Sequence, residues 1–166
     1  MEREKKSLLG LLSTNVVIVT SVADGRPHGC TSNAWGEPEA GNTLLITLSR
    51  SGTTHDVVMA RGIFGISILT TSQRDLAFQF AKSYADPLDR FVGVRLDESG
   101  AVPVIADSLA TLICAVESST PFGQYEAIIA SITHAHSNGP GSPLIHFNGQ
   151  LGQFQAVQPI RIGESS

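Results

Sequence analysis

Residues 16–35 read VVIVTSVADGRPHGCTSNAW, a pattern that predicts a strand, a tight turn and a return strand. Its first part, Val16 to Val22, is β-branched almost throughout, which is typical of a strand buried on both faces. Asp24-Gly25 then predicts a tight hairpin turn, because glycine tolerates the positive φ that such a turn requires. We expect the return strand to run from His28 to Trp35.

Further strands follow at hairpin spacing, with few helices between them. The other expected strands are residues 43–48, 63–69, 109–118, 124–136, 143–148 and 150–157. The expected helices are residues 2–12, 54–61 and 72–84, and residues 85–107 are expected to form a loop with short pieces of strand. A doubly wound parallel sheet would need a helix after almost every strand. The sequence therefore predicts a mostly β, antiparallel barrel with two or three short peripheral helices.

Composition excludes several classes of protein. The 166 residues carry a formal net charge of −4, whereas a non-specific nucleic-acid binder needs a basic face. No apolar run approaches the ~18 residues of a membrane span, and the mixed charges of Met1 to Lys6 do not resemble a signal peptide. We therefore expect a cytoplasmic, single-domain protein with Cys30 and Cys114 as reduced thiols. Charged residues make up only 16%, against ~25% in typical domains, which hints at a surface buried against another subunit.

Motifs for nucleophilic, metal or P-loop chemistry are missing from the sequence. It has no G-x-S-x-G elbow, no CxxC pair, no G-x-G-x-x-G and no Walker A motif. His134 and His136 alternate on one strand face, so they either ligate a metal or mark a solvated strand end. His146 lies in an apolar strand, where a hydrogen-bonded barrel histidine is commoner than a ligand.

The first candidate ligand-binding segment is Gly29 to Ala34, whose side chains are mostly small and polar. Small side chains let a flat ligand approach the backbone, whose N–H groups can then meet ring carbonyls. The alternative is a strand that ends in ordinary turn residues.

The second segment is Ser49-Arg50-Ser51-Gly52-Thr53-Thr54, between a strand and a helix. Hydroxyls, a guanidinium and the N–H groups of a helix N-terminus together form an anion cradle without a P-loop. The alternative is a helix cap in which Thr53 or Thr54 satisfies the first turn.

Taken in order, these blocks resemble the flavin reductase family, the small partners of two-component flavin monooxygenases. The blocks that carry the resemblance are Val16–Ser21, Asp24-Gly25, Pro27-His28-Gly29, Thr31–Ala34, Ser51-x-x-Thr54, Gly62-Ile63-Phe64, Ile68-Leu69, Gln73, Phe80-Ala81 and Asp89-Arg90-Phe91. Each block alone is weak, but the ordered series is specific and spans about residues 10–156.

The resemblance implies a Greek-key, FMN-binding split β-barrel that forms a homodimer. It implies FMN or FAD as cofactor, NADH or NADPH as hydride donor, and a separate flavin-dependent monooxygenase as partner. Thr31, Ser32, Asn33 and Ala34 would line the isoalloxazine edge. Further residues would hold or approach the phosphate or the dinucleotide, namely Ser49, Arg50, Ser51, Thr54, Lys82 and Arg90.

The chain departs from the family pattern in two places. Glu39-Ala40-Gly41-Asn42-Thr43 replaces the usual Pro-Pro pair, and Gly123-Gln124-Tyr125 replaces the usual Gly-Asp-His. Tyr125 would stack on the nicotinamide or the flavin, or fill the barrel mouth. The leading hypothesis is therefore an NAD(P)H:flavin oxidoreductase. The second is a flavin-binding carrier without NAD(P)H turnover, and the third is a split-barrel oxidase of a small amine.

Overall fold

The computed structural model describes residues 11–33, 35–36 and 41–155. Its strands are β1 (Thr14–Asn15), β2 (Val17–Ala23), β3 (Arg26–Ser32), β4 (Trp35–Gly36), β5 (Thr43–Ser49), β6 (Ile63–Ile68), β7 (Leu96–Asp97), β8 (Val104–Ile105), β9 (Ala110–Phe122), β10 (Tyr125–Ser137), β11 (Leu144–Phe147) and β12 (Gln150–Gln153). Its helices are α2 (Thr53–Arg61) and α3 (Arg74–Ala81), with 3-10 helices η1 (Thr71–Gln73) and η2 (Pro87–Phe91). The helix expected at residues 2–12 lies outside the described residues except for its last two.

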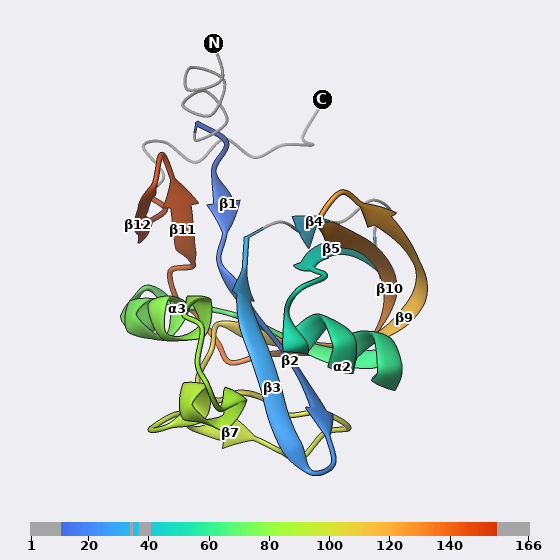
Figure 1. Ribbon diagram of the computed structural model, residues 1–166. Coiled ribbons are helices and arrows are strands. Elements are labelled where there is room, and N and C mark those ends of the chain that lie inside the picture. Colours follow the sequence, from blue (N-terminus) through green and yellow to red (C-terminus); the bar gives the residue numbers. More distant parts are fainter. Residues whose placement is uncertain (1–10, 34, 37–40, 156–166) are drawn as a thin grey trace.

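The main sheet has seven strands in the order β3-β2-β6-β9-β10-β5-β4, and all its pairings are antiparallel. It curls into a barrel with α2 and α3 on opposite sides of β3 (Figure 1). The two edges, β3 and β4, are separated along the chain only by residues 33–34, so the split of the barrel lies there. This confirms the mostly β, antiparallel split barrel.

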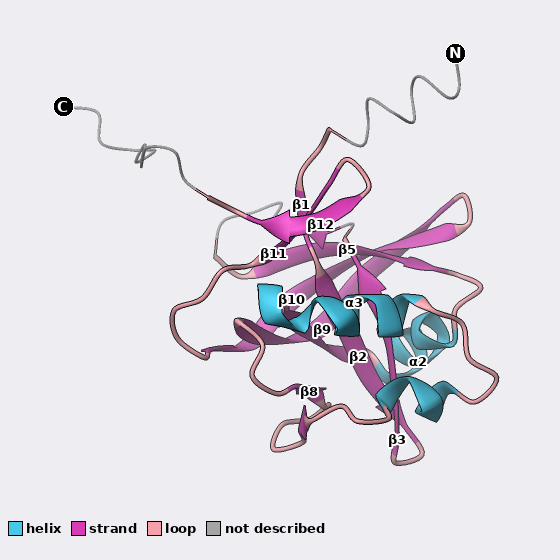
Figure 2. Cartoon of the chain, turned by 90° about the vertical axis from the view of Figure 1, so that its left-hand side faces the viewer, coloured by secondary structure: helices cyan, strands magenta, loops and turns pink. Residues whose placement is uncertain are grey.

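Two smaller sheets flank the barrel at opposite ends. β1, β11 and β12 form one of them, and β7 pairs with β8 in the other. Figure 2 shows the first beyond one end of the barrel and β8 near the other. Within the residues that the structure describes, neither helix has the length and apolar character needed to cross a bilayer.

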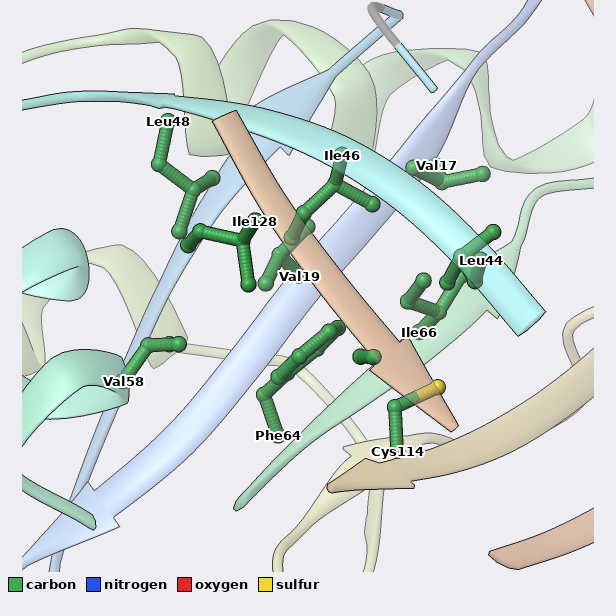
Figure 3. Close-up of a cluster of buried hydrophobic side chains, with 11 residues drawn as sticks. Val17, Val19, Leu44, Ile46, Leu48, Val58, Phe64, Ile66, Cys114 and Ile128 are labelled. Atoms are coloured by element: carbon green, nitrogen blue, oxygen red, sulfur yellow. The ribbon is translucent and has the colours of Figure 1, made fainter. Parts of the chain in front are cut away.

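Strand β2 lies between two hydrophobic cores, which explains its apolar run. Val17 and Val19 point into the barrel and pack with Phe64 and Ile66 (Figure 3). Ile18 belongs instead to a second core, together with Val16, Leu69, Ala77, Phe80, Ile105 and Leu144. Because successive side chains of a strand alternate between its faces, a strand with a core on each face must be apolar throughout.

The predicted hairpin turn is confirmed. Asp24 and Gly25 both have positive φ, at 50° and 71°, as a type I′ turn requires. The predicted return strand is too long, because β3 ends at Ser32. Trp35 begins β4, the opposite edge strand of the sheet, and pairs with Ile46 of β5.

The helix expected over residues 72–84 is also wrong at its C-terminal end. It begins with the 3-10 turn η1, where Thr70 and Gln73 form a capping box. α3 then ends at Ala81, because Lys82 is extended, with φ −77° and ψ 153°.

Candidate functional site

A cavity of about 600 Å³ lies between the end of β3, the start of α2 and η2. The residues that line it are Cys30, Thr31, Ser32, Asn33, Thr47, Leu48, Ser49, Ser51, Gly52, Thr53, Thr54, His55, Ser83, Tyr84, Arg90 and Tyr125. The structure thus brings together eight of the predicted site residues from four segments of the chain. These are Thr31, Ser32, Asn33, Ser49, Ser51, Thr54, Arg90 and Tyr125.

The turn between β5 and α2 forms one wall of the cavity and is rich in hydroxyl groups. The Oγ atoms of Ser49 and Ser51 lie 3.0 Å apart. The N-cap of α2 is Gly52, and no side chain caps the helix. Thr53 and Thr54 therefore lie inside the first turn, and the interpretation of either as the N-cap is wrong. Helix N–H groups without intrahelical partners are suited to an anion at this position.

Arg90 is the cation among the residues that line the cavity. Its guanidinium donates hydrogen bonds to the backbone carbonyls of Gly29 and Lys82. It also lies 5.6 Å from the centre of the Tyr84 ring. Its Nε is buried without a hydrogen-bond partner, and no carboxylate of the described residues forms an ion pair with it. A partly buried cation without a counter-charge favours an anionic ligand.

Three predicted residues are not among those that line the cavity. Lys82 contributes its backbone carbonyl to Arg90, while its side chain is not part of the lining. Arg50 is half-exposed, and its Nε lies 3.6 Å from Oε2 of Glu126. Ala34 lies outside the described residues.

The end of β3 forms another wall of the cavity. Strand β3 is an edge strand with β2 as its neighbour. Its Thr31 Oγ1 donates a 2.7 Å hydrogen bond to the Ala77 carbonyl of α3. Just beyond it, Asn33 Nδ2 lies 3.5 Å from His146 Nδ1. Strand β3 does end in this small polar segment, as the interpretation of an ordinary strand end requires. The segment also lines the cavity, as the ligand-binding interpretation requires, so the two interpretations are compatible.

The thiol at the cavity, Cys30, has a raised pKa, which disfavours its nucleophilic thiolate form. Burial raises the pKa of Cys30 to about 11, and a hydrogen bond from Thr54 offsets only part of this rise. Cys114 is likewise a free thiol, as expected from the sequence. His134 and His136 are exposed, and the described residues contain no group of three or more metal-binding side chains.

A second cavity, of about 710 Å³, adjoins the first and shares Thr31 and Asn33 with it. Its wall includes Arg74, whose guanidinium lies 5.6 Å from the centre of the Phe78 ring. An aromatic ring next to a cation can stack with a heterocycle while the cation binds a phosphate.

Comparison with known proteins matches residues 9–155 to the family model of the flavin reductase like domain. The chain belongs to the flavin reductase family. One relative in this family is the reductase component of 4-nitrophenol 4-monooxygenase/4-nitrocatechol 2-monooxygenase from Rhodococcus opacus. It is 30% identical over 152 residues, which cover 91% of this chain and 80% of the relative. The NADH-dependent FMN reductase AsuE2 from Streptomyces nodosus subsp. asukaensis is 28% identical, over 88% of this chain and 81% of that protein.

Solved structures of flavin reductases share the fold. The flavin reductase PheA2 in its native state superposes with a TM-score of 0.83 at 25% identity, over 94% of this chain and 99% of that chain. Component B of a nitrilotriacetate monooxygenase from Mycobacterium thermoresistibile gives a TM-score of 0.88 at 21% identity, over 98% and 93% of the two chains.

Sequence reasoning missed several residues at the cavity of this flavin reductase. His55 directly follows Thr54 and lines the cavity, as does Tyr84. Glu126 lies just behind and is buried. A signal for Glu126 was available, because a lone carboxylate in the apolar run YEAIIASI occupies an inward position of the strand.

Proposed function

We propose that this chain is an NAD(P)H-dependent flavin reductase that transfers a hydride from NADH or NADPH to FMN or FAD. The reduced flavin would serve a separate flavin-dependent monooxygenase. Relatives named as reductase components of such systems support this. The observation that carries the proposal is the cavity itself, which is lined both by the hydroxyl-rich N-terminus of α2 and by Arg90, a cation with no carboxylate partner among the described residues.

The residues fit the two ends of a flavin mononucleotide. Ser49, Ser51 and Thr54 offer hydroxyls to the phosphate, and Arg90 offers a charged donor. Such charge-assisted hydrogen bonds are the strong ones. Thr31 to Asn33 would border the isoalloxazine ring, because an edge strand has backbone groups that no neighbouring strand uses. Arg50 and Lys82 would act at the rim of the cavity, and Ala34 stays a prediction.

Hydride transfer requires orientation more than reactive side chains. A bound flavin supplies the ring that accepts the hydride, and the protein supplies binding, alignment and electrostatics. The second cavity would admit the nicotinamide nucleotide, since Thr31 and Asn33 border both cavities. Tyr125, which is 42% exposed at the first cavity, would stack on a ring there.

A homodimer is part of the same proposal. The described surface exposes many large apolar side chains for a chain with few charges. They are Leu11, Leu12, Phe78, Val92, Phe122, Tyr125, Ile129, Phe147 and Phe154. Contact between two copies would bury some of them. Light scattering of the purified protein should therefore give about twice 17.5 kDa, and a clean monomer would contradict the dimer. The cytoplasmic location stays a prediction from the sequence.

The decisive experiment adds FMN to the purified protein and then NADH or NADPH under anaerobic conditions. Bleaching of the visible flavin band at a rate proportional to enzyme would support the reductase. Flavin that binds without bleaching would favour the carrier, the candidate suggested by Gln124-Tyr125 in place of the family's Asp-His. No flavin binding would contradict both functions.

A further inference from the structure

Glu126 is a buried carboxylate directly behind the hydroxyl-rich turn between β5 and α2. It follows Tyr125 on β10 and pairs with Leu48 of the neighbouring strand. Neighbouring residues of a strand point to opposite faces. Tyr125 is accordingly exposed at the cavity, while Glu126 retains 7% exposure.

Two cationic or potentially cationic side chains meet this carboxylate. Its Oε2 lies 3.6 Å from Nε of Arg50 and 4.0 Å from Nε2 of His55. Arg50 stands in the turn and His55 in the first turn of α2, so one carboxylate is linked to both ends of the proposed phosphate cradle. The second nitrogen of His55, Nδ1, lies 2.9 Å from the carboxylate of Asp56.

Nε is the Arg50 nitrogen that forms the ion pair with Glu126, at 3.6 Å, which is longer than a hydrogen bond. A guanidinium has five N–H donors in a planar fork. With Nε paired to Glu126, the two Nη groups remain for a ligand, and they form no hydrogen bond within the described part of the chain. His55 Nε2 is buried and has no hydrogen-bond partner.

We propose that Glu126 is a positioning residue for the flavin phosphate, acting through Arg50 and His55. It orients the Arg50 fork so that its Nη groups serve the phosphate, and it fixes the first turn of α2 through His55. The inference rests on the proposed function and adds to it a residue that touches neither flavin nor nicotinamide. A purely structural role would be the alternative, with the ion pairs only compensating burial of the carboxylate.

FMN and riboflavin separate these two roles, because they share the ring and differ in the phosphate. The variant Glu126→Gln keeps the shape and removes the charge. We expect the KM for FMN to rise roughly tenfold, as for loss of one charged hydrogen bond. The kcat with FMN and both constants with riboflavin should stay within about twofold, a spread below ~0.5 kcal/mol. Glu117→Gln, the same change at an exposed position of the adjacent strand β9, is the matched control.

A second variant, Glu126→Asp, guards against misfolding because it retains the charge. Its shorter side chain withdraws the carboxylate from Arg50, so the same loss selective for FMN is expected. Equal changes with FMN and riboflavin, or no change with either, would overturn the inference while leaving the reductase intact. Wild-type protein that reduces neither flavin would overturn the proposed function and the inference with it.

Discussion

Arg90 donates a hydrogen bond to the backbone carbonyl of Gly29, which ties a cation from η2 to edge strand β3 beside the cavity. This contact fixes the guanidinium without neutralising it, since a carbonyl carries no formal charge. The chain therefore holds a preorganised positive group where the proposed ligand is negative.

Replacing Arg90 with methionine should weaken FMN binding by about 1.5–3 kcal/mol, the range for hydrogen bonds to charged groups. Fluorescence titration of FMN against the variant measures the loss. Riboflavin, titrated in parallel, should be affected much less. An FMN affinity equal to that of the wild type would remove Arg90 from the phosphate site.

Replacing Arg50 with alanine should also weaken FMN binding, by about 1.5 kcal/mol. The effect is expected near the lower end of the range because the Arg50 side chain is 50% exposed and solvent screens such interactions. Isothermal titration at two salt concentrations tests this, and the loss should shrink at the higher one. Unchanged affinity would place the phosphate away from the turn between β5 and α2.

Tyr125 should contribute through its ring rather than its hydroxyl. Tyr125→Phe is expected to keep kcat/KM for NADH near the wild-type value. Tyr125→Ala should lower it by up to about tenfold, which corresponds to the ~0.5–1.5 kcal/mol of an aromatic stacking contact. Steady-state kinetics at saturating FMN provide the comparison. If Tyr125→Phe were as impaired as Tyr125→Ala, stacking would be the wrong explanation.

Gly29 should be intolerant of any side chain. A Cβ there would lie 3.0 Å from Cε1 of Phe80 and 3.0 Å from the Val19 carbonyl oxygen. We expect Gly29→Ala to lower the free energy of unfolding by about 1–3 kcal/mol, as overpacking does, and urea denaturation measures it. Gly36→Ala is the control, since a Cβ at Gly36 meets nothing within 4 Å. Equal stability of the two variants would contradict the close packing.

Stability should fall in mild acid because of His28. Burial, followed by the charges of Arg26 and Arg90, lowers its pKa below the ordinary 6.5. The unfolded chain therefore binds the proton at His28 more readily than the folded chain does. The stability associated with neutral His28 is fully present above pH ~6.5 and is lost as the pH falls below that value. Melting temperatures between pH 5 and pH 8 should drop less for His28→Gln than for the wild type. Parallel curves for the two proteins would exclude His28 as the cause.

The sequence was sufficient to predict those elements that depend only on residues adjacent along the chain. The β-branched run of β2 and the Asp24-Gly25 turn follow from strand burial and glycine conformation. The series of blocks contains six of the eight predicted cavity residues, and the other two are Ser49, from the hydroxyl-rich segment, and Tyr125, from the departure at Gly123-Gln124-Tyr125. These eight were identified through resemblance and residue chemistry, since nothing local says that η2 returns to the end of β3.

Features that depend on strand register were not predictable. The register of β10 against β9 shifts between Ile132 and His134, which is a β-bulge. The bulge reverses the alternation, so His134 lies opposite Ile113 and His136 opposite Thr111, away from the buried Cys114. A strict period of two would have turned both histidines toward the interior. The break between β3 and β4 also depends on the sheet as a whole, because the chain passes there from one edge of the seven-stranded sheet to the other.

The position of β2 between two hydrophobic cores also bears on how the protein unfolds. Val17 and Val19 belong to one core and Ile18 to the other along a single strand, so we expect the two cores to unfold together. The barrel interior and the layer beneath α3 therefore form one cooperative unit, and a single unfolding transition should be seen by every probe. Native-state hydrogen exchange should accordingly give the amides of β2 the protection of global unfolding. The cavity proposed for the flavin is bordered by β3, the strand next to β2.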